Sequence, residues 1–174
     1  MTDRDPRDYT GVVPFPEQIT LRPIGVVRST YTERYGTPRQ AGLDGPGGDA
    51  PARLELDPAV IDAAALNDLD GFDRVWVLAW LHLNRPEWPT RVRPPRGGPR
   101  RGLFSTRAPH RPNPIGLSAP RLLRVDGHTV HVAGLDLIDG TPLLDLKPYV
   151  PFADAFPDAA AGWVDEMGGA PKRG

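Results

Sequence analysis

The sequence contains no cysteine, which excludes disulfides, thiolate metal ligands and a cysteine nucleophile. It also has no apolar run long enough to span a membrane and no signal peptide, so we expect a cytoplasmic protein without membrane contact. Lysine is scarce: Lys147 and Lys172 are the only two, and the remaining basic side chains are arginines. A formal net charge of −1 does not by itself indicate a nucleic-acid binder.

Proline and glycine are abundant, with 22 prolines and 19 glycines in 174 residues. This content favours many loops and turns over a helical bundle. The length suits a single domain with tails. We predict a disordered N-terminal tail over residues 1–20, a folded domain over 21–156 and a polar C-terminal tail over 157–174.

One stretch rich in proline, residues 102–118, is the most informative part of the sequence. Pro109, Pro112 and Pro114 fix their own φ angles and bias the residues before them towards extended backbone. A stiff loop of this kind holds polar side chains such as Arg107 at low entropic cost, as a binding site requires. The alternative is a rigid surface loop whose arginines are only solvated.

Apolar and β-branched runs separated by turn residues predict a mainly β fold, a small barrel or sandwich with long Pro/Gly-rich loops. Asp57 and Pro58 predict the start of one short helix over 58–66. Asp126-Gly127 and Asp139-Gly140 predict tight turns. The run 73–83 predicts a central strand buried on both faces. The other predicted strands are 21–28, 52–56, 103–105, 115–125, 129–132 with its continuation over 134–139, and 141–149.

Two further loops bear on function. The glycines of 44–48 neither follow a strand nor open a helix, so a flexible turn is favoured over a phosphate-binding loop. The excursion 84–101 is rich in arginine, proline and glycine, and it can contact nucleic-acid phosphates or be a solvated, mobile loop. A lone histidine such as His82, at the end of a predicted strand, is more often a core or rim residue than part of a site.

Three blocks of the sequence together resemble the TsaA-like, or TrmO, family of tRNA N6-threonylcarbamoyladenosine methyltransferases. The blocks are residues 24–29 with 37–40, residues 107–118 and residues 135–149, and the resemblance covers about 21–156. It implies a single-sheeted β-barrel that binds S-adenosylmethionine and forms a homodimer, with the cofactor near the subunit interface. The family's bacterial type member carries an extra C-terminal domain, whereas this sequence ends soon after the expected barrel.

The resemblance also implies a set of cofactor contacts. They fall on Pro38, Arg39, Gln40, His82, Leu83, Arg107, Leu117, Gly134, Leu135, Asp136, Leu137 and Ile138. Within this set, Gln40 suits the edge of the adenine, and Arg39 or Arg107 suits the carboxylate of the cofactor. No metal is expected.

Methylation at N6 of an adenosine releases a proton. Asp136, Asp139 and Asp145 are the candidate bases, with Tyr149 or Lys147 as positioning groups, although each aspartate can instead cap a turn. Arg111 suits the threonine carboxylate of the modified base, which lies in the unpaired anticodon loop of a tRNA. The other expected substrate contacts are Asn113, Lys147, Arg96, Arg100 and Arg101.

Two other hypotheses stay open. One is a methyltransferase of the same fold that acts on another small or RNA substrate. The other is a non-catalytic barrel that binds RNA or a nucleotide. Binding of S-adenosylmethionine separates the second from both methyltransferase hypotheses, and dependence on the threonylcarbamoyl group separates the two methyltransferases from each other.

Overall fold

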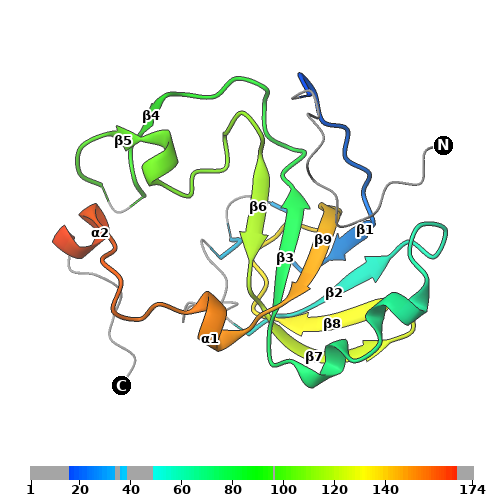
Figure 1. Ribbon diagram of the computed structural model, residues 1–174. Coiled ribbons are helices and arrows are strands. Elements are labelled where there is room, and N and C mark those ends of the chain that lie inside the picture. Colours follow the sequence, from blue (N-terminus) through cyan, green and yellow to red (C-terminus); the bar gives the residue numbers. More distant parts are fainter. Residues whose placement is uncertain (1–15, 34–35, 39–48, 96, 168–174) are drawn as a thin grey trace, which may run out of the picture.

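The computed structural model describes residues 16–33, 36–38, 49–95 and 97–167. Within these residues the fold is mainly β, with seven strands in one antiparallel sheet of order β6-β3-β9-β1-β2-β8-β7 (Figure 1). The strands are β1 (Gly25–Arg28), β2 (Pro51–Leu56), β3 (Val75–Trp80), β6 (Ile115–Ser118), β7 (Arg121–Asp126), β8 (Thr129–Ala133) and β9 (Pro142–Pro148).

The core lies on one face of this sheet. Strand β3 shows why: Val75, Val77 and Ala79 are fully buried, whereas Trp76 and Leu78 are only half-buried. Strands β2 and β8 alternate in the same way, so one face of each packs inward. The prediction that the run 73–83 is buried on both faces is therefore wrong, because its second face carries large side chains that stay partly exposed.

The prediction of a barrel also needs correction, because the sheet is open. Strands β6 and β7 form its two edges and are not paired with each other in the sheet order. At the start of β7 the contacts are with the residues just before β3: Arg74 and Arg121 form an isolated bridge, and Leu122 N donates to Asp73 O at 2.8 Å. The chain passes from β6 to β7 through Ala119 and Pro120, and since proline has no N–H it cannot donate to a closing ladder. In Figure 1, β2, β8 and β7 run crosswise to β6, β3 and β9, so the sheet is curled without closing.

Both predicted turns are present. Asp126 pairs with Thr129 across the β7–β8 hairpin, which leaves Gly127 and His128 as the two loop residues. Gly127 has φ 55°, the left-handed conformation that a glycine adopts without strain. At the second turn, Gly140 has φ 78°, and it leads directly into β9.

The predicted helix over 58–66 is not a continuous helix. The carboxylate of Asp57 accepts from Ala59 N and that of Asp62 accepts from Ala64 N, each at 2.9 Å. These two local caps divide the segment into short turns, the second of which is the 3₁₀ helix η1 (Ala63–Leu66). A further 3₁₀ turn, η2 (Leu69–Gly71), follows before β3.

Three other segments differ from the predicted strands. Residues 103–105 form the 3₁₀ helix η3 (Leu103–Ser105). The run 115–125 divides into β6, which pairs with β3, and β7, which pairs with β8. Residues 134–139 leave the sheet at Gly134, whose φ is 74°. The excursion 84–101 contributes a small separate pair, β4 (Arg91–Val92) with β5 (Arg101–Gly102).

After β9 the chain forms two short helices, α1 (Pro151–Asp154) and α2 (Trp163–Glu166). Asp154 ties α1 to the sheet, because its carboxylate accepts from Trp76 Nε1 at 3.0 Å. No helix within the described ranges is long and apolar enough to cross a membrane. The predicted tail over 1–20 lies largely outside the described residues, and the predicted domain limits stay predictions.

Candidate functional site

Four segments converge at one end of the sheet. They are residues 29–31 after β1, residues 81–84 after β3, residues 106–114 before β6 and residues 134–141 before β9. The antiparallel pairing explains this, because the ends of β1 and β3 lie beside the starts of β6 and β9. The sheet therefore brings together segments that lie far apart in the sequence.

Residues 29–31 hold the segment before β9 in place. Ser29 N donates to Asp139 Oδ1 at 3.0 Å, and Ser29 Oγ donates to Leu137 O at 2.9 Å. Asp139 N donates back to Tyr31 O at 2.7 Å. Leu135 and Leu137 are buried in the hydrophobic core, and their packing there also anchors the segment.

Asp136 lies between these two leucines and is half-buried. Its Oδ1 accepts a 2.6 Å hydrogen bond from Oγ of Ser118, a residue of β6 that is only 3% exposed. Burial, and next the charge of the Asp136 carboxylate, raise the pKa of Tyr31 above its ordinary value of 10.0. The arrangement is an oriented carboxylate beside a phenol that stays un-ionised at neutral pH.

The loop 106–114 is stiffened by its own polar contacts. Arg111 Nη1 donates to Thr106 O at 2.9 Å and to Ala108 O at 3.3 Å. Its guanidinium also lies 5.3 Å from the centre of the Phe104 ring. Asn84 Nδ2 donates to Pro109 O at 2.9 Å, which joins this loop to the segment after β3. Side-chain hydrogen bonds, in addition to the prolines, therefore restrict the conformation of this loop.

The predicted cofactor residues lie mostly, but not all, at this end. Residues 134–138 form its floor, and His82, Leu83 and Arg107 are exposed at its rim. His82 lies beyond β3, which ends at Trp80. The side chain of Leu117 lies on the outer face of β6, opposite to the face of Ser118 and Asp136, and is 57% exposed. Pro38 is half-buried, and Arg39 and Gln40 lie outside the described residues.

The other predicted catalytic residues have different surroundings. Asp139 is engaged by Ser29 N and also lies 3.8 Å from Arg28 Nη1. A hydrogen bond to Glu55 raises the pKa of Arg28 further above its ordinary range, so this guanidinium stays charged. Asp145 Oδ2 lies 2.8 Å from Lys147 Nζ. Tyr149 packs on Trp76, with ring centres 5.3 Å apart, at the opposite end of β3.

The predicted substrate residues fall into two groups. Arg111 and the exposed Asn113 belong to the loop 106–114, whereas Arg100 and Arg101 belong to the β4–β5 excursion. Arg101 is already engaged by Glu166, at 3.2 Å. Lys147 lies on β9 opposite Trp76, away from both groups, and Arg96 lies outside the described residues.

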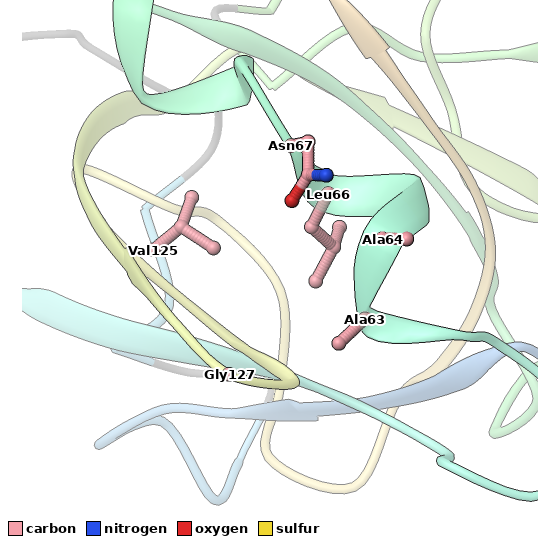
Figure 2. Close-up of a pocket in the computed structure, with 6 residues that line it drawn as sticks. All are labelled: Ala63, Ala64, Leu66, Asn67, Val125 and Gly127. Carbon is pink, nitrogen blue, oxygen red and sulfur yellow. The ribbon is translucent and has the colours of Figure 1, made fainter.

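A hollow elsewhere on the surface is not part of this arrangement. It has a volume of about 350 Å³ and lies between η1 and the β7–β8 hairpin, where Leu66, Asn67 and Val125 line it (Figure 2). Only the side chain of Asn67 is polar among the six residues drawn. None of the predicted site residues lines this hollow.

Two residues at the convergent end were missed from the sequence. Ser118 is the last residue of the stretch 102–118, and the signal that could have found it is a serine at an inward position of an apolar strand, which indicates a buried hydrogen bond. Tyr31 lies in an irregular segment with no periodicity. Only its proximity to Asp136, across about a hundred residues of sequence, marks it.

The residues at this end fit S-adenosylmethionine chemically. Its carboxylate suits a guanidinium such as Arg107, its adenine suits apolar and backbone partners around Leu83 and residues 134–138, and its cationic sulfur suits a carboxylate such as Asp136. Among the described residues no group of three or more His, Asp or Glu side chains is placed to hold a metal ion.

Fold and site together define a class: single-sheet, mainly β domains whose polar site is built from loops at one end of the sheet. Within it, the chain belongs to the tRNA-methyltransferase O N-terminal domain family, which matches residues 26–155. The resemblance inferred from the three sequence blocks is confirmed.

Individual relatives agree with this assignment. The chain is 42% identical over 148 residues to the tRNA (adenine(37)-N6)-methyltransferase of Escherichia coli K12, which covers 81% of the chain and 62% of the relative. It is 40% identical over 132 residues to a "Probable S-adenosyl-L-methionine-binding protein" of Methanothermobacter thermautotrophicus, with 76% and 90% covered. The crystal structure of TrmO from Pseudomonas aeruginosa superposes with a TM-score of 0.72 at 40% identity, over 85% of this chain and 63% of that chain. The chain thus spans less than two thirds of the bacterial relatives.

Proposed function

We propose that the chain transfers a methyl group from S-adenosylmethionine to N6 of threonylcarbamoyladenosine, next to the anticodon of a tRNA. The observation that carries this proposal is the Asp136 carboxylate, oriented at 2.6 Å by a buried serine and close to Tyr31, in a chain of this family. The name of the E. coli relative supports the acceptor atom and the RNA.

S-adenosylmethionine supplies an electrophilic methyl group on a sulfonium. In the proposal, Arg107 binds its carboxylate, and residues 134–138 with His82, Leu83 and Leu117 contact the rest of the molecule, together with residues 38–40. Holding the donor and the acceptor nitrogen in line accounts for much of the rate in such a displacement. The anchoring of residues 134–139 by Ser29 and Tyr31 supports this role, because it fixes one wall of the site.

Asp136 is the proposed base. As N6 forms its bond to the methyl carbon, its proton passes to the Asp136 carboxylate, while the bond from that carbon to sulfur breaks and its electron pair stays on sulfur. Asp139 and Asp145 are weaker candidates, because each lies beside a cation, Arg28 or Lys147, whereas Ser118, the partner of Asp136, is neutral. The neutral hydroxyl of Tyr31 is suited to orient the acceptor base, a role expected of Tyr149 from the sequence.

Recognition of the modified base is assigned to the loop 106–114. Arg111 is held by two carbonyls of its own loop and by Phe104, so its guanidinium is pre-oriented to meet the threonine carboxylate. The exposed Asn113 belongs to the same loop. Arg100 and Arg101, with Arg96, are proposed to contact tRNA phosphates, and Lys147 lies too far along β9 for us to keep it in this group.

A homodimer is part of the proposal. The outer face of edge strand β6 carries Ile115 and Leu117, which are 40% and 57% exposed, and Leu83 and Phe104 are more exposed still. A set of large apolar side chains beside a sheet edge is typical of a surface that another chain covers.

The test is transfer of a labelled methyl group to two matched tRNAs, one with and one without threonylcarbamoyladenosine. We expect label only on the modified tRNA, and we expect Arg107→Ala to weaken cofactor binding in a parallel titration. Label on both tRNAs, or on neither while the cofactor still binds, would favour a methyltransferase with another substrate. Absence of cofactor binding would favour a non-catalytic domain.

A further inference from the structure

The β4–β5 pair stands apart from the main sheet (Figure 1). Its strands pair at two positions, Arg91 with Gly102 and Val92 with Arg101, and two more hydrogen bonds join its arms, from Leu103 N to Thr90 O at 2.9 Å and from Arg91 Nη2 to Arg100 O at 2.8 Å. A two-stranded ribbon of this size is marginally stable alone. Contacts with another part of the chain are therefore needed to hold the ribbon in position. The ribbon carries Arg101, one of the arginines expected at the RNA, and leads through η3 to Arg107.

Helix α2 makes three contacts with this region. Trp163 Nε1 donates to Ser105 O at 2.9 Å. Glu166 Oε2 lies 3.2 Å from Arg101 Nη2. The Arg101 guanidinium carbon also lies 5.3 Å from the centre of the Trp163 ring, within the range of a cation–π contact. Residues about 60 positions apart are thereby joined by one indole and one carboxylate.

These contacts differ in what they hold. Ser105 is the last residue of η3 and lies two residues before Arg107, so the indole N–H fixes the entry to the loop 106–114. Arg101 lies in β5, so the ring and the carboxylate fix the ribbon itself. The Glu166 side chain is 68% exposed, and an ion pair so open to water contributes little. Most of the effect therefore belongs to Trp163, which is half-buried.

We propose that Trp163 is a positioning residue. It binds Ser105 and Arg101 together, and so holds the β4–β5 ribbon and the Arg107 loop in the orientation in which their arginines receive an RNA backbone. The RNA part of this inference rests on the proposed function; the coupling of α2 to the ribbon does not. The chemistry expected of the partner is a phosphate chain, which suits guanidinium groups held at fixed spacing.

The experiment compares Trp163→Ala, Trp163→Phe and Glu166→Gln with the wild-type chain. Asp158→Asn is the matched control, because it removes the same charge from the same segment and Asp158 makes no side-chain hydrogen bond or ion pair among the described residues. Hydrogen exchange of the backbone amides over 91–105 reports the ribbon. Binding of a tRNA anticodon stem–loop, and the separate effects on KM and kcat, report the arginines. Thermal unfolding checks that each variant is folded.

We expect Trp163→Ala to speed amide exchange and to weaken RNA binding about tenfold through KM, with kcat nearly unchanged. Trp163→Phe keeps an aromatic ring over Arg101 but loses the N–H that donates to Ser105 O, so we expect its effect to lie between those of the wild type and Trp163→Ala. We expect Glu166→Gln to change amide exchange and RNA binding little, and Asp158→Asn to change neither.

Three results would overturn the inference. Unchanged exchange in Trp163→Ala means that α2 does not hold the ribbon. Faster exchange with unchanged RNA binding means that the contact has no part in recognition. Tighter RNA binding in Glu166→Gln means that α2 masks Arg101 instead. If the wild-type chain transfers no methyl group, the proposed function fails, while exchange and RNA binding still decide this inference.

Discussion

The Asp136 carboxylate and the Ser118 hydroxyl behave as one unit, since a 2.6 Å hydrogen bond from a buried serine fixes the orientation of the carboxylate. Asp136→Asn keeps the shape and an acceptor for Ser118 but loses the ability to take a proton. We expect kcat for methyl transfer to fall by about 10²–10⁴, with a smaller loss of cofactor affinity because the charge that suits the sulfonium is also removed. Single-turnover rates and a cofactor titration measure the two effects separately.

Asp145→Asn is the control for this prediction, because Asp145 is paired with Lys147 on β9 instead of facing the convergent end. Its kcat should stay within a few-fold of wild type. An equal loss in both variants would mean that charge anywhere near the sheet matters, and Asp136 would lose its assigned role.

Tyr31 gives a prediction about pH. Burial, followed by the Asp136 charge, raises its pKa above 10.0, so the folded state favours the neutral phenol. The resulting stabilisation is fully present below about pH 10 and is lost as the pH rises through the folded-state pKa, because the folded state binds the proton more tightly than the unfolded state. In an ultraviolet titration, Tyr31→Phe should therefore remove a late-titrating phenol. Removal of one that titrates at or below its ordinary value would contradict this.

The site could be predicted from the sequence only where its residues lie within one motif. Residues 134–138 and Arg107 were placed by blocks of the sequence, and the structure brings them to one end. The sequence could not rank Asp136, Asp139 and Asp145, because their ranking depends on partners from β6, from the segment after β1 and from β9. No sequence pattern marks Tyr31 as a site residue, since it is a single tyrosine in a segment without periodicity.

At the level of elements, the contact of β1 with β2 leaves no room for a side chain at Gly25. A Cβ added there would lie 2.3 Å from Glu55 O and 2.8 Å from Leu56 Cα, both of which are backbone atoms that cannot rotate away. The two strands must separate to accept it. We expect Gly25→Ala to lower the free energy of unfolding by about 2 kcal/mol, as overpacked sites do. Urea unfolding measures this loss.

Gly71→Ala is the matched control, because nothing lies within 4 Å of a Cβ at that position and its φ is not in the left-handed region. Its free energy of unfolding should change by less than about 0.5 kcal/mol. Similar losses in both variants would mean that backbone conformation, and not the approach of β2, explains the glycine at position 25.

Elements were predictable where the local pattern and the tertiary fold agree. The alternation of apolar residues in β2 and β8 matches the face that each strand buries, and the two glycine turns lie where expected. Predictions failed where neighbours decide. The run 115–125 reads as one strand, but its two halves pair with different partners on either side of Pro120. The two capping aspartates near η1 suit short turns as well as a helix.

For the whole molecule, composition and turn spacing predicted a mainly β domain, but not whether the sheet closes. Closure would require the edge strands β6 and β7 to pair, and in the sheet order they do not; the bridge at Arg121 joins β7 to Arg74, just before β3. The open edge of β6 therefore follows from three-dimensional geometry that no local pattern contains. The proposed homodimer interface lies at this edge.

We expect Ile115→Glu to shift the molecule from dimer to monomer, because a charge placed on the outer face of β6 would have to be buried unpaired in the interface. Leu123→Glu is the control: Leu123 is 49% exposed and lies on β7, the other edge of the sheet, so its dimer should persist. Sedimentation velocity over a range of concentrations distinguishes the two states, and thermal unfolding checks that both variants fold.

A wild-type chain that stays monomeric at high concentration, or a Leu123→Glu variant that dissociates while Ile115→Glu does not, would contradict an interface at β6. A monomeric Ile115→Glu that also loses cofactor affinity would further mean that each site needs the partner subunit, consistent with Leu117 pointing outward from the same strand.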